Sequence, residues 1–338
     1  MTGLIDADVH QGLNPAFWER LELPWRKMAV PGGFSWPAHA LGHNGTRQDI
    51  GPPGSDGDPA VLVRDLLEPH GTRYAILTGS KVLGINVHPN SLFAMAFARA
   101  YNDWLIETWL GYDPRFRGSM LIAPQDIAGS VKEVERVGKH PGIVQILISG
   151  SSPLLYGKRY FWPLYEAAEA HNLPIAIHPL GLMPTGSGWM STYLEHHTML
   201  LTRDFMNHLV SLICEGVFEQ FPKLKVVLIE GGVAAYVPLL WRLDKNWKAV
   251  RAEVPWLKRT PSEYIPTNIR FTTQPIEEPE DEGLLLELYH ELDAFHTVMY
   301  SSDWPHWDFD SPAAILRDFP EDLRRRIFVE NARELYSL

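Results

Sequence analysis

Acidic and imidazole side chains stand at the ends of several short apolar runs in this sequence. The first run ends in Asp8-Val9-His10, and the alternation of a β-strand places the side chains of Asp8 and His10 on the same side. A later run ends in His178, and the last run leads into Asp303. Two imidazoles and two carboxylates are ligands that divalent cations bind. We therefore predict that Asp8, His10, His178 and Asp303 hold one divalent metal ion.

Glu230 ends a further apolar run, directly before Gly231-Gly232. Its carboxylate can act as a general acid or base if burial or a neighbouring charge moves its pKa toward neutrality. It can equally have a structural role, in which it bonds the backbone or an arginine such as Arg242. Any of these acids and histidines taken singly is common in a protein core, so the metal-site hypothesis depends on their meeting at one place.

Eight β-type runs recur between longer helical stretches and would position these residues. Several of the runs are almost continuously apolar, which is typical of a parallel sheet covered by helices. The predicted strands cover residues 4–10, 73–79, 117–124, 143–149, 174–178, 224–230, 269–274 and 297–303. The pattern predicts an α/β fold, a single (β/α)8 TIM barrel of residues 1–338, whose catalytic groups stand at the ends of several strands.

Residues 11–60 interrupt the repeat after the first predicted strand. This segment is rich in proline and glycine, and a loop of such length in a compact domain is usually a lid or disordered. An insertion at this point would lie over the carboxyl ends of the strands, so we interpret it as lid-like. Its apolar residues Phe34, Trp36 and Leu41 are alternatively part of a subunit interface.

Charge and composition limit the partners of the chain. Its 338 residues include 30 Lys+Arg against 41 Asp+Glu, a formal net charge of −11, which would repel nucleic acid and anionic membrane surfaces. The N-terminus lacks a signal-peptide pattern and no run reaches about 18 apolar residues, so we expect a cytoplasmic protein that does not cross a membrane. The lone Cys214 lies in an apolar run and is expected to be a buried, inert thiol.

The sequence resembles the amidohydrolase superfamily, within it the amidohydrolase-related group that includes aminocarboxymuconate-semialdehyde decarboxylase. The resemblance extends almost from end to end and includes the metal-site residues named above. It also includes Asn102-Asp103-Trp104-Leu105, Asp113-Pro114-Arg115-Phe116-Arg117-Gly118, Phe221-Pro222-Lys223-Leu224-Lys225 and Ser302-Asp303-Trp304-Pro305-His306. The resemblance implies a barrel of the metal-dependent hydrolase type with one catalytic divalent metal, zinc or manganese, on Asp8, His10, His178 and Asp303.

Two departures from the family pattern affect what the resemblance implies. Many members begin with His-x-His, whereas Asp8-Val9-His10 is more similar to the Glu-x-His of nonoxidative benzoate-type decarboxylases. A carboxylate in that position tilts metal preference from zinc toward manganese or magnesium. Decarboxylase relatives also carry a catalytic His at the end of the sixth strand, and Glu230 stands there in this chain.

Two reactions are compatible with this ligand set. In a decarboxylase, the metal and a cationic side chain hold the substrate carboxylate while Asp303 or Glu230 protonates the carbon that loses carbon dioxide. In a hydrolase, the metal lowers the pKa of bound water and Asp303 takes its proton as hydroxide attacks an amide, ester or lactone. We favour decarboxylation of an aromatic or unsaturated carboxylic acid. A noncatalytic binding subunit is a third interpretation.

Aromatic and basic residues near the predicted strand ends are candidates for substrate binding. Trp304 and His306 follow the strand-eight acid directly, and Trp189 and His197 follow strand five. Arg47, in the insertion, is the candidate for a substrate carboxylate. We expect a small-molecule substrate as the partner and, because related barrels often pair, a homodimer.

Overall fold

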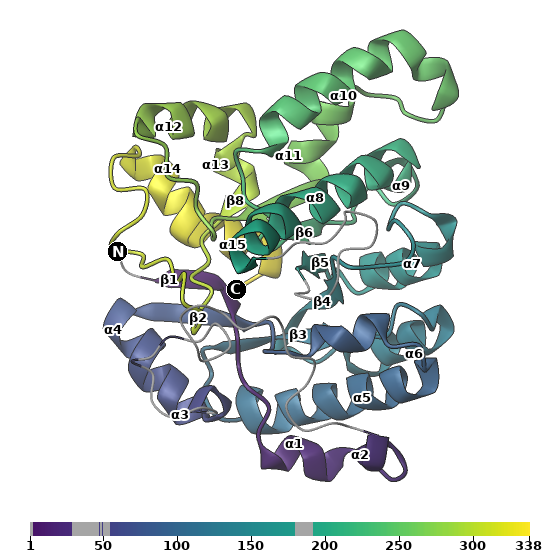
Figure 1. The fold of residues 1–338 in the computed structure, drawn as a ribbon, viewed down its shortest axis with the longest axis vertical. Helices are drawn as coiled ribbons and strands as arrows, with labels where there is room; N and C mark the ends of the chain where they lie inside the picture. Colours follow the sequence, from purple (N-terminus) through teal and green to yellow (C-terminus); the bar gives the residue numbers. More distant parts are fainter. Residues whose placement is uncertain (1–2, 29–46, 48, 50–54, 180–191) are drawn as a thin grey trace.

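Eight strands form one parallel sheet that runs in chain order and closes into a barrel (Figure 1). The computed structural model describes all residues except 1–2, 29–46, 48, 50–54 and 180–191. The strands are β1 (Leu4–Val9), β2 (Thr72–Leu77), β3 (Phe116–Leu121), β4 (Ile143–Ser149), β5 (Ile175–His178), β6 (Val226–Leu228), β7 (Ile269–Thr272) and β8 (Val298–Met299). The predicted (β/α)8 barrel is therefore confirmed, with every predicted strand present.

The seam between the first and last strands is closed by backbone contacts. The Ala7 N–H donates to the Tyr300 carbonyl at 2.9 Å, and the His10 N–H donates to the Trp304 carbonyl at 2.8 Å. Val9 and Trp304 form an isolated parallel bridge at the same place. This seam brings the residues after β8 beside the end of β1, which is where the predicted metal ligands lie.

Helices cover the outside of the barrel because each crossover between parallel strands returns along its surface (Figure 1). The α-helices are α1 (Pro15–Arg20), α2 (Trp25–Met28), α3 (Pro59–Leu62), α4 (Glu68–His70), α5 (Ser91–Trp104), α6 (Ile127–Val137), α7 (Trp162–Ala170), α8 (Tyr193–Cys214), α9 (Val217–Gln220), α10 (Tyr236–Val250), α11 (Ile265–Asn268), α12 (Glu282–Glu291), α13 (Ala294–Thr297), α14 (Glu321–Arg325) and α15 (Asn331–Tyr336). Turns of 3-10 helix cover Ser55–Gly57, Leu83–Val87, Arg159–Phe161, Arg251–Glu253 and Pro261–Tyr264, and turns of π-helix cover Val63–Leu67, Leu105–Leu110 and Arg326–Glu330.

Side-chain caps fix where several of these helices begin. The Asn90 carboxamide oxygen accepts from the Phe93 N–H at 3.0 Å before α5, and the Asp126 carboxylate accepts from the Gly129 N–H at 2.9 Å before α6. Such caps satisfy N–H groups that have no partner within the helix. Among the described residues no helix is long and apolar enough to cross a membrane.

The described part of the insertion is partly helical rather than structureless. Phe17 of α1 packs edge-on against Phe97 and Trp104 of α5, with ring centroids 4.9 and 5.9 Å apart, so α1 lies on the outside of the barrel (Figure 1). Residues 29–46, including Phe34, Trp36 and Leu41, lie outside the described residues, and the lid stays a prediction. Cys214 is half-buried, not fully buried as expected, and burial raises the pKa of its thiol.

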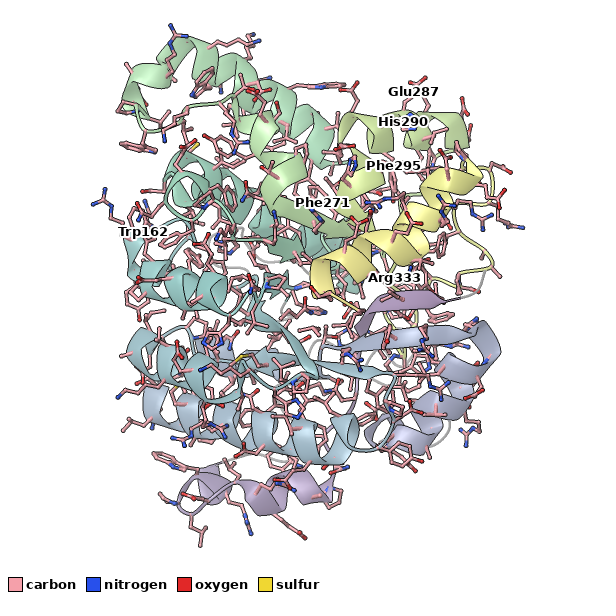
Figure 2. The ribbon with its side chains drawn as sticks, turned by 180° about the vertical axis from the view of Figure 1, so that it is seen from behind. Trp162, Phe271, Glu287, His290, Phe295 and Arg333 are labelled. Carbon is pink, nitrogen blue, oxygen red and sulfur yellow. The ribbon has the colours of Figure 1, made fainter. Side chains whose placement is uncertain are left out.

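The last helix helps to seal the amino-terminal end of the barrel. Tyr336 of α15 donates to the Gln145 side-chain oxygen of β4 at 2.8 Å, and the Gln145 amide donates to Ser119 at 2.8 Å. Seen from behind, Arg333 of the same helix lies next to β1 (Figure 2). With this end filled, the predicted metal ligands occupy the opposite end, at the carboxyl termini of the strands, which we call the barrel mouth.

Candidate metal centre

Five buried side chains from four strand ends meet at the barrel mouth. Asp8 lies on β1 and His10 just after it, while His178 ends β5. Glu230 and Asp303 come from the segments that follow β6 and β8. Their exposed fractions are between 0% and 8%, so bulk water does not screen their charges. We call these five residues the mouth cluster.

The two acids that follow strands enter the mouth cluster through an unusual backbone conformation. Glu230 has φ of 55° and Asp303 has φ of 58°, in the left-handed region that residues other than glycine seldom adopt. The Glu230 N–H donates to the Thr272 hydroxyl at 3.1 Å instead of extending the strand ladder. Non-glycine residues in this region are concentrated at functional sites, where the surrounding structure holds them in place.

Nitrogen and oxygen atoms of the mouth cluster lie within contact distance across the barrel. The His10 Nε2 atom lies 2.9 Å from an Asp303 oxygen, 3.2 Å from Glu230 Oε1 and 3.6 Å from Asp8 Oδ1. The His178 Nε2 atom lies 2.8 Å from Glu230 Oε1 and 3.7 Å from Asp8 Oδ2. The structure thus brings together all four predicted metal ligands and adds Glu230 to them.

Backbone carbonyls fix the orientation of both imidazoles. The His10 Nδ1 atom lies 2.8 Å from the Gly79 carbonyl, and the His178 Nδ1 atom lies 2.7 Å from the Pro179 carbonyl. Because a carbonyl only accepts, each Nδ1 carries the proton and each Nε2 faces the carboxylates. This arrangement, with the second ring nitrogen bonded to a carbonyl, is typical of metal-binding histidines.

The charges of the mouth cluster move the pKa values of its members in opposite directions. Burial lowers the pKa of His10, but the carboxylates of Asp8, Asp303 and Glu230 outweigh burial and raise it well above its usual value. Burial and the neighbouring Glu230 charge raise the pKa of Asp303 well above that of an ordinary carboxyl. Burial raises the pKa of Glu230, but His178 and His10 outweigh it and lower this pKa. A proton therefore favours Asp303 over Glu230.

The donor set fits a divalent metal ion. Asp8 Oδ1 accepts from the Thr78 hydroxyl at 2.5 Å, but Asp8 Oδ2 is buried and has no hydrogen-bond partner among the described residues. A buried carboxylate oxygen without a donor needs a cation. Donor atoms lie within 4.8 Å of one another in two overlapping groups of described residues: Asp8, His10, His178 and Glu230, and His10, Glu230, Asp303 and His306.

The predicted substrate residues after β8 differ in their placement. The His306 Nδ1 atom lies 2.6 Å from Asp303 Oδ1, and the His306 ring centroid lies 4.4 Å from that of His10. Burial and the neighbouring His10 lower the pKa of His306 to about 4, so its imidazole is neutral near pH 7. Trp304 is 1% exposed and packs in the hydrophobic core. Its aromatic character is therefore explained by core packing.

His197 reaches the β7 and β8 side of the barrel mouth from α8. Its Nε2 atom lies 3.4 Å from an Asp308 oxygen, and its ring centroid lies 5.6 Å from that of Trp307. Asp308 also accepts from the Gln274 amide at 2.9 Å. Burial lowers the pKa of His197, but Asp308 outweighs it and raises this pKa. The sequence reasoning missed Gln274 and Asp308, although Gln274 ends the predicted strand 269–274 and Asp308 follows the predicted strand 297–303.

Arg47 lies beside the segment after β8, and its guanidinium already has partners. It forms a two-point contact with Asp49, with distances of 3.0 and 2.6 Å, and its Cζ lies 4.7 Å from the Phe309 ring centroid. The Arg47 N–H donates to the Pro305 carbonyl at 2.9 Å. Substrate binding by Arg47 stays a prediction, and Trp189 lies outside the described residues.

Sequence reasoning also missed the residues that hold the ligands in place. Thr78 donates to Asp8, and Gly79 accepts from His10, both just after β2. Asp6 Oδ1 accepts from the backbone N–H of Ser302 at 2.9 Å, which ties β1 to the segment that carries Asp303. Thr78 and Gly79 stand at the end of the predicted strand 73–79, but neither a threonine nor a glycine suggests metal chemistry by itself.

A closed parallel barrel with buried histidines and carboxylates at its mouth defines the class of metal-dependent (β/α)8 enzymes. Residues 80–338 match the amidohydrolase family. The chain belongs to this family, as the sequence resemblance indicated.

Three relatives with known names align over most of the chain. A gamma-resorcylate decarboxylase from Polaromonas sp. is 28% identical over 291 residues, which are 81% of this chain and 86% of the relative. The crystal structure of a dihydroxybenzoic acid decarboxylase from Polaromonas sp. contains manganese and the inhibitor 2-nitroresorcinol. It is similar to this structure with a TM-score of 0.73 and 24% identity, and the match covers 100% of this chain and 98% of the decarboxylase. The structure of a 5-carboxyvanillate decarboxylase from Novosphingobium aromaticivorans, complexed with manganese, matches with a TM-score of 0.75 and 22% identity. This match covers 100% of this chain and 96% of the decarboxylase.

Proposed function

We propose that this protein is a metal-dependent nonoxidative decarboxylase of hydroxylated aromatic carboxylic acids. The observation that carries the proposal is the mouth cluster, in which two imidazoles and three carboxylates face one another at the carboxyl ends of the strands. The relatives named as decarboxylases of gamma-resorcylate and 5-carboxyvanillate support this class of substrate.

Asp8, His10, His178 and Asp303 are the residues that would hold the metal, which is manganese in two of the related structures. When bound, a divalent metal supplies positive charge for the substrate carboxylate and an adjacent oxygen. The chain itself supplies orientation, because Gly79 and Pro179 fix both imidazoles and Thr78 fixes one oxygen of Asp8. Zinc remains the second candidate metal.

Asp303 is the group that carries the transferred proton. Burial and the Glu230 charge favour its protonated form, and the neutral His306 imidazole contacts one of its oxygens. In the proposed step, Asp303 protonates the ring carbon that bears the carboxylate. The bond between this carbon and the carboxylate then breaks, its electron pair returns to the ring and carbon dioxide leaves. The aspartate regains its proton from solvent before the next turnover.

The test is a panel of ortho-hydroxylated benzoates given to the manganese-loaded protein. We expect release of carbon dioxide and of the corresponding phenol in equal amounts, measured by gas analysis and by chromatography. A matching panel of amides, esters and lactones tests hydrolysis, which would use the same ligands. Turnover of that second panel alone would replace decarboxylation by hydrolysis. A protein that binds metal but turns over neither panel would favour the binding-subunit interpretation.

We also propose a homodimer in the cytoplasm that acts on a small molecule. The inhibitor bound in a related structure supports a small-molecule ligand. Light scattering during size-exclusion chromatography measures the mass, which would be about twice the 38.4 kDa of one chain if the dimer forms. A mass of one chain at all concentrations would exclude the dimer.

A further inference from the structure

Glu230 follows β6, and its carboxylate lies in the mouth cluster in contact with both imidazoles. We propose that Glu230 is itself a ligand of the metal ion, as a third carboxylate beside Asp8 and Asp303. The inference rests on the metal centre of the proposed function but not on its substrate or reaction.

The contacts of the Glu230 carboxylate place it among the predicted ligands. Its Oε1 atom lies 2.8 Å from His178 Nε2 and 3.2 Å from His10 Nε2. Asp8, His10, His178 and Glu230 together form a group whose donor atoms all lie within 4.8 Å of one another. Among the described residues, the Glu230 side chain makes these contacts and none with Arg242 or the backbone, which were the structural alternatives.

The orientation of the two imidazoles indicates that a cation belongs between these atoms. Both Nδ1 atoms face backbone carbonyls, so the Nε2 atoms of both rings point toward Glu230 Oε1. The two Nε2 atoms also lie 3.3 Å from each other. Lone pairs at such distances repel unless a proton or a cation lies between them. One divalent ion satisfies the two nitrogens, Glu230 Oε1 and the unpartnered Asp8 Oδ2 atom together.

The charge of the centre follows from this assignment. With three ionised carboxylates, a divalent ion leaves a net charge of 2 − 3 = −1. A third oxygen ligand also makes the donor set harder, which favours manganese or magnesium over zinc.

Metal titration tests the inference without any substrate. We would compare Glu230→Gln, which keeps the shape but loses the charge, with Glu277→Gln. Glu277 accepts from the N–H groups of Val233 and Ala234 at 2.9 Å, so it bonds the same turn without joining the mouth cluster. Free manganese is measured by electron paramagnetic resonance, and folding is checked by circular dichroism.

We expect Glu230→Gln to weaken manganese binding by about 100-fold, since loss even of groups that only support a ligand costs 10–100-fold. The Glu277→Gln variant should bind manganese with the affinity of the wild type. Glu230→His, which offers a nitrogen ligand in place of the carboxylate, should shift preference from manganese toward zinc in competition. Wild-type manganese affinity in folded Glu230→Gln would overturn the inference. A wild-type protein that binds manganese but releases no carbon dioxide would instead count against the proposed function alone.

Discussion

Asp303 is the residue that we propose as the acid, and its position is fixed by several contacts. Its carboxylate contacts His10 Nε2 at 2.9 Å and His306 Nδ1 at 2.6 Å, and its backbone lies in the left-handed region. Burial and Glu230 favour its protonated form, while the neighbouring histidines hold its orientation. These contacts and this direction of the pKa shift support the proposed role of Asp303 as the acid at the reacting carbon.

Asp303→Asn removes the acidic proton and keeps the shape of the side chain. We expect kcat for decarboxylation to fall by about 1,000-fold, the usual range for loss of a general acid. The measurement is the steady-state rate at saturating manganese and substrate, with Asp310→Asn as the control on the same loop. A variant that retained a tenth of wild-type kcat would place the proton on another group.

Asp310 supports a second prediction, about stability and pH. Burial is the main cause that raises the pKa of Asp310 to about 7, with Asp308 and Glu278 adding to it, whereas the carboxyl titrates near 3.8 when unfolded. The folded state therefore binds one proton more than the unfolded state between these pH values. The contribution of Asp310 to stability is largest below about pH 4 and is lost as pH rises through 7.

Asp310→Asn cannot ionise but still accepts from the Ile276 N–H, a bond of 3.1 Å in the wild type. We expect its Tm to exceed that of the wild type by about 1–3 °C at pH 8 and to match it near pH 4, because the buried charge is then absent in both. Thermal unfolding followed by circular dichroism at both pH values checks this. A Tm difference that did not change with pH would show that ionisation of Asp310 is not its cause.

The strands show how far sequence patterns determine this fold. The apolar runs predicted all eight strands, because a parallel barrel buries both faces of each strand. Six of the predicted strands extended past their observed ends, and β8 did so by most, since it ends at Met299 and not at residue 303; β6 ends at Leu228 and not at residue 230. Beyond these points, the backbone N–H groups donate to side-chain oxygens of strands that are adjacent in the barrel but distant in the sequence. The Glu230 N–H donates to Thr272, and the Ser302 N–H donates to Asp6.

The same long-range bonds explain which parts of the site were predictable. The alternation of β1 directs Asp8 and His10 to one side, so their type and position could be inferred locally. The approach of Glu230 to both imidazoles depends on a left-handed residue held by the neighbouring strand, which periodicity does not encode. The support of His10 by Gly79 likewise depends on a carbonyl, which any residue type would offer.

Gly157 supports a prediction about how the loop after β4 packs on α8. A Cβ at this position would lie 2.2 Å from the Ser211 carbonyl oxygen of α8, and backbone cannot move aside as a flexible side chain can. We expect Gly157→Ala to cost about 1–3 kcal/mol and to lower Tm by about 1–4 °C. Gly57→Ala is the control, since its Cβ would meet its nearest neighbour at 3.4 Å. Equal Tm values for both variants would contradict the prediction.

At the scale of the whole molecule, the metal centre joins segments that are far apart in the sequence. The mouth cluster spans residues 8 to 303 and draws on the ends of β1, β5, β6 and β8. Unfolding separates these residues, so a metal ion that binds only the folded barrel stabilises it by mass action. At a free manganese concentration 100 times Kd, the gain is about 2.7 kcal/mol, which for a chain of this length is a rise in Tm of about 4 °C.

Protons compete with the metal for the same nitrogen atoms, which gives this stabilisation a pH dependence. Burial lowers the pKa of His10 and His178, but the carboxylates around them outweigh burial and raise both. As pH falls below these raised values, more of the Nε2 atoms are protonated and manganese must displace the proton. We therefore expect the same manganese concentration to raise Tm by less at pH 5.5 than at pH 8. The Asp8→Ala/His178→Ala variant should show no rise at either pH, and an equal rise in the wild type at both would mean that manganese binds elsewhere than on these imidazoles.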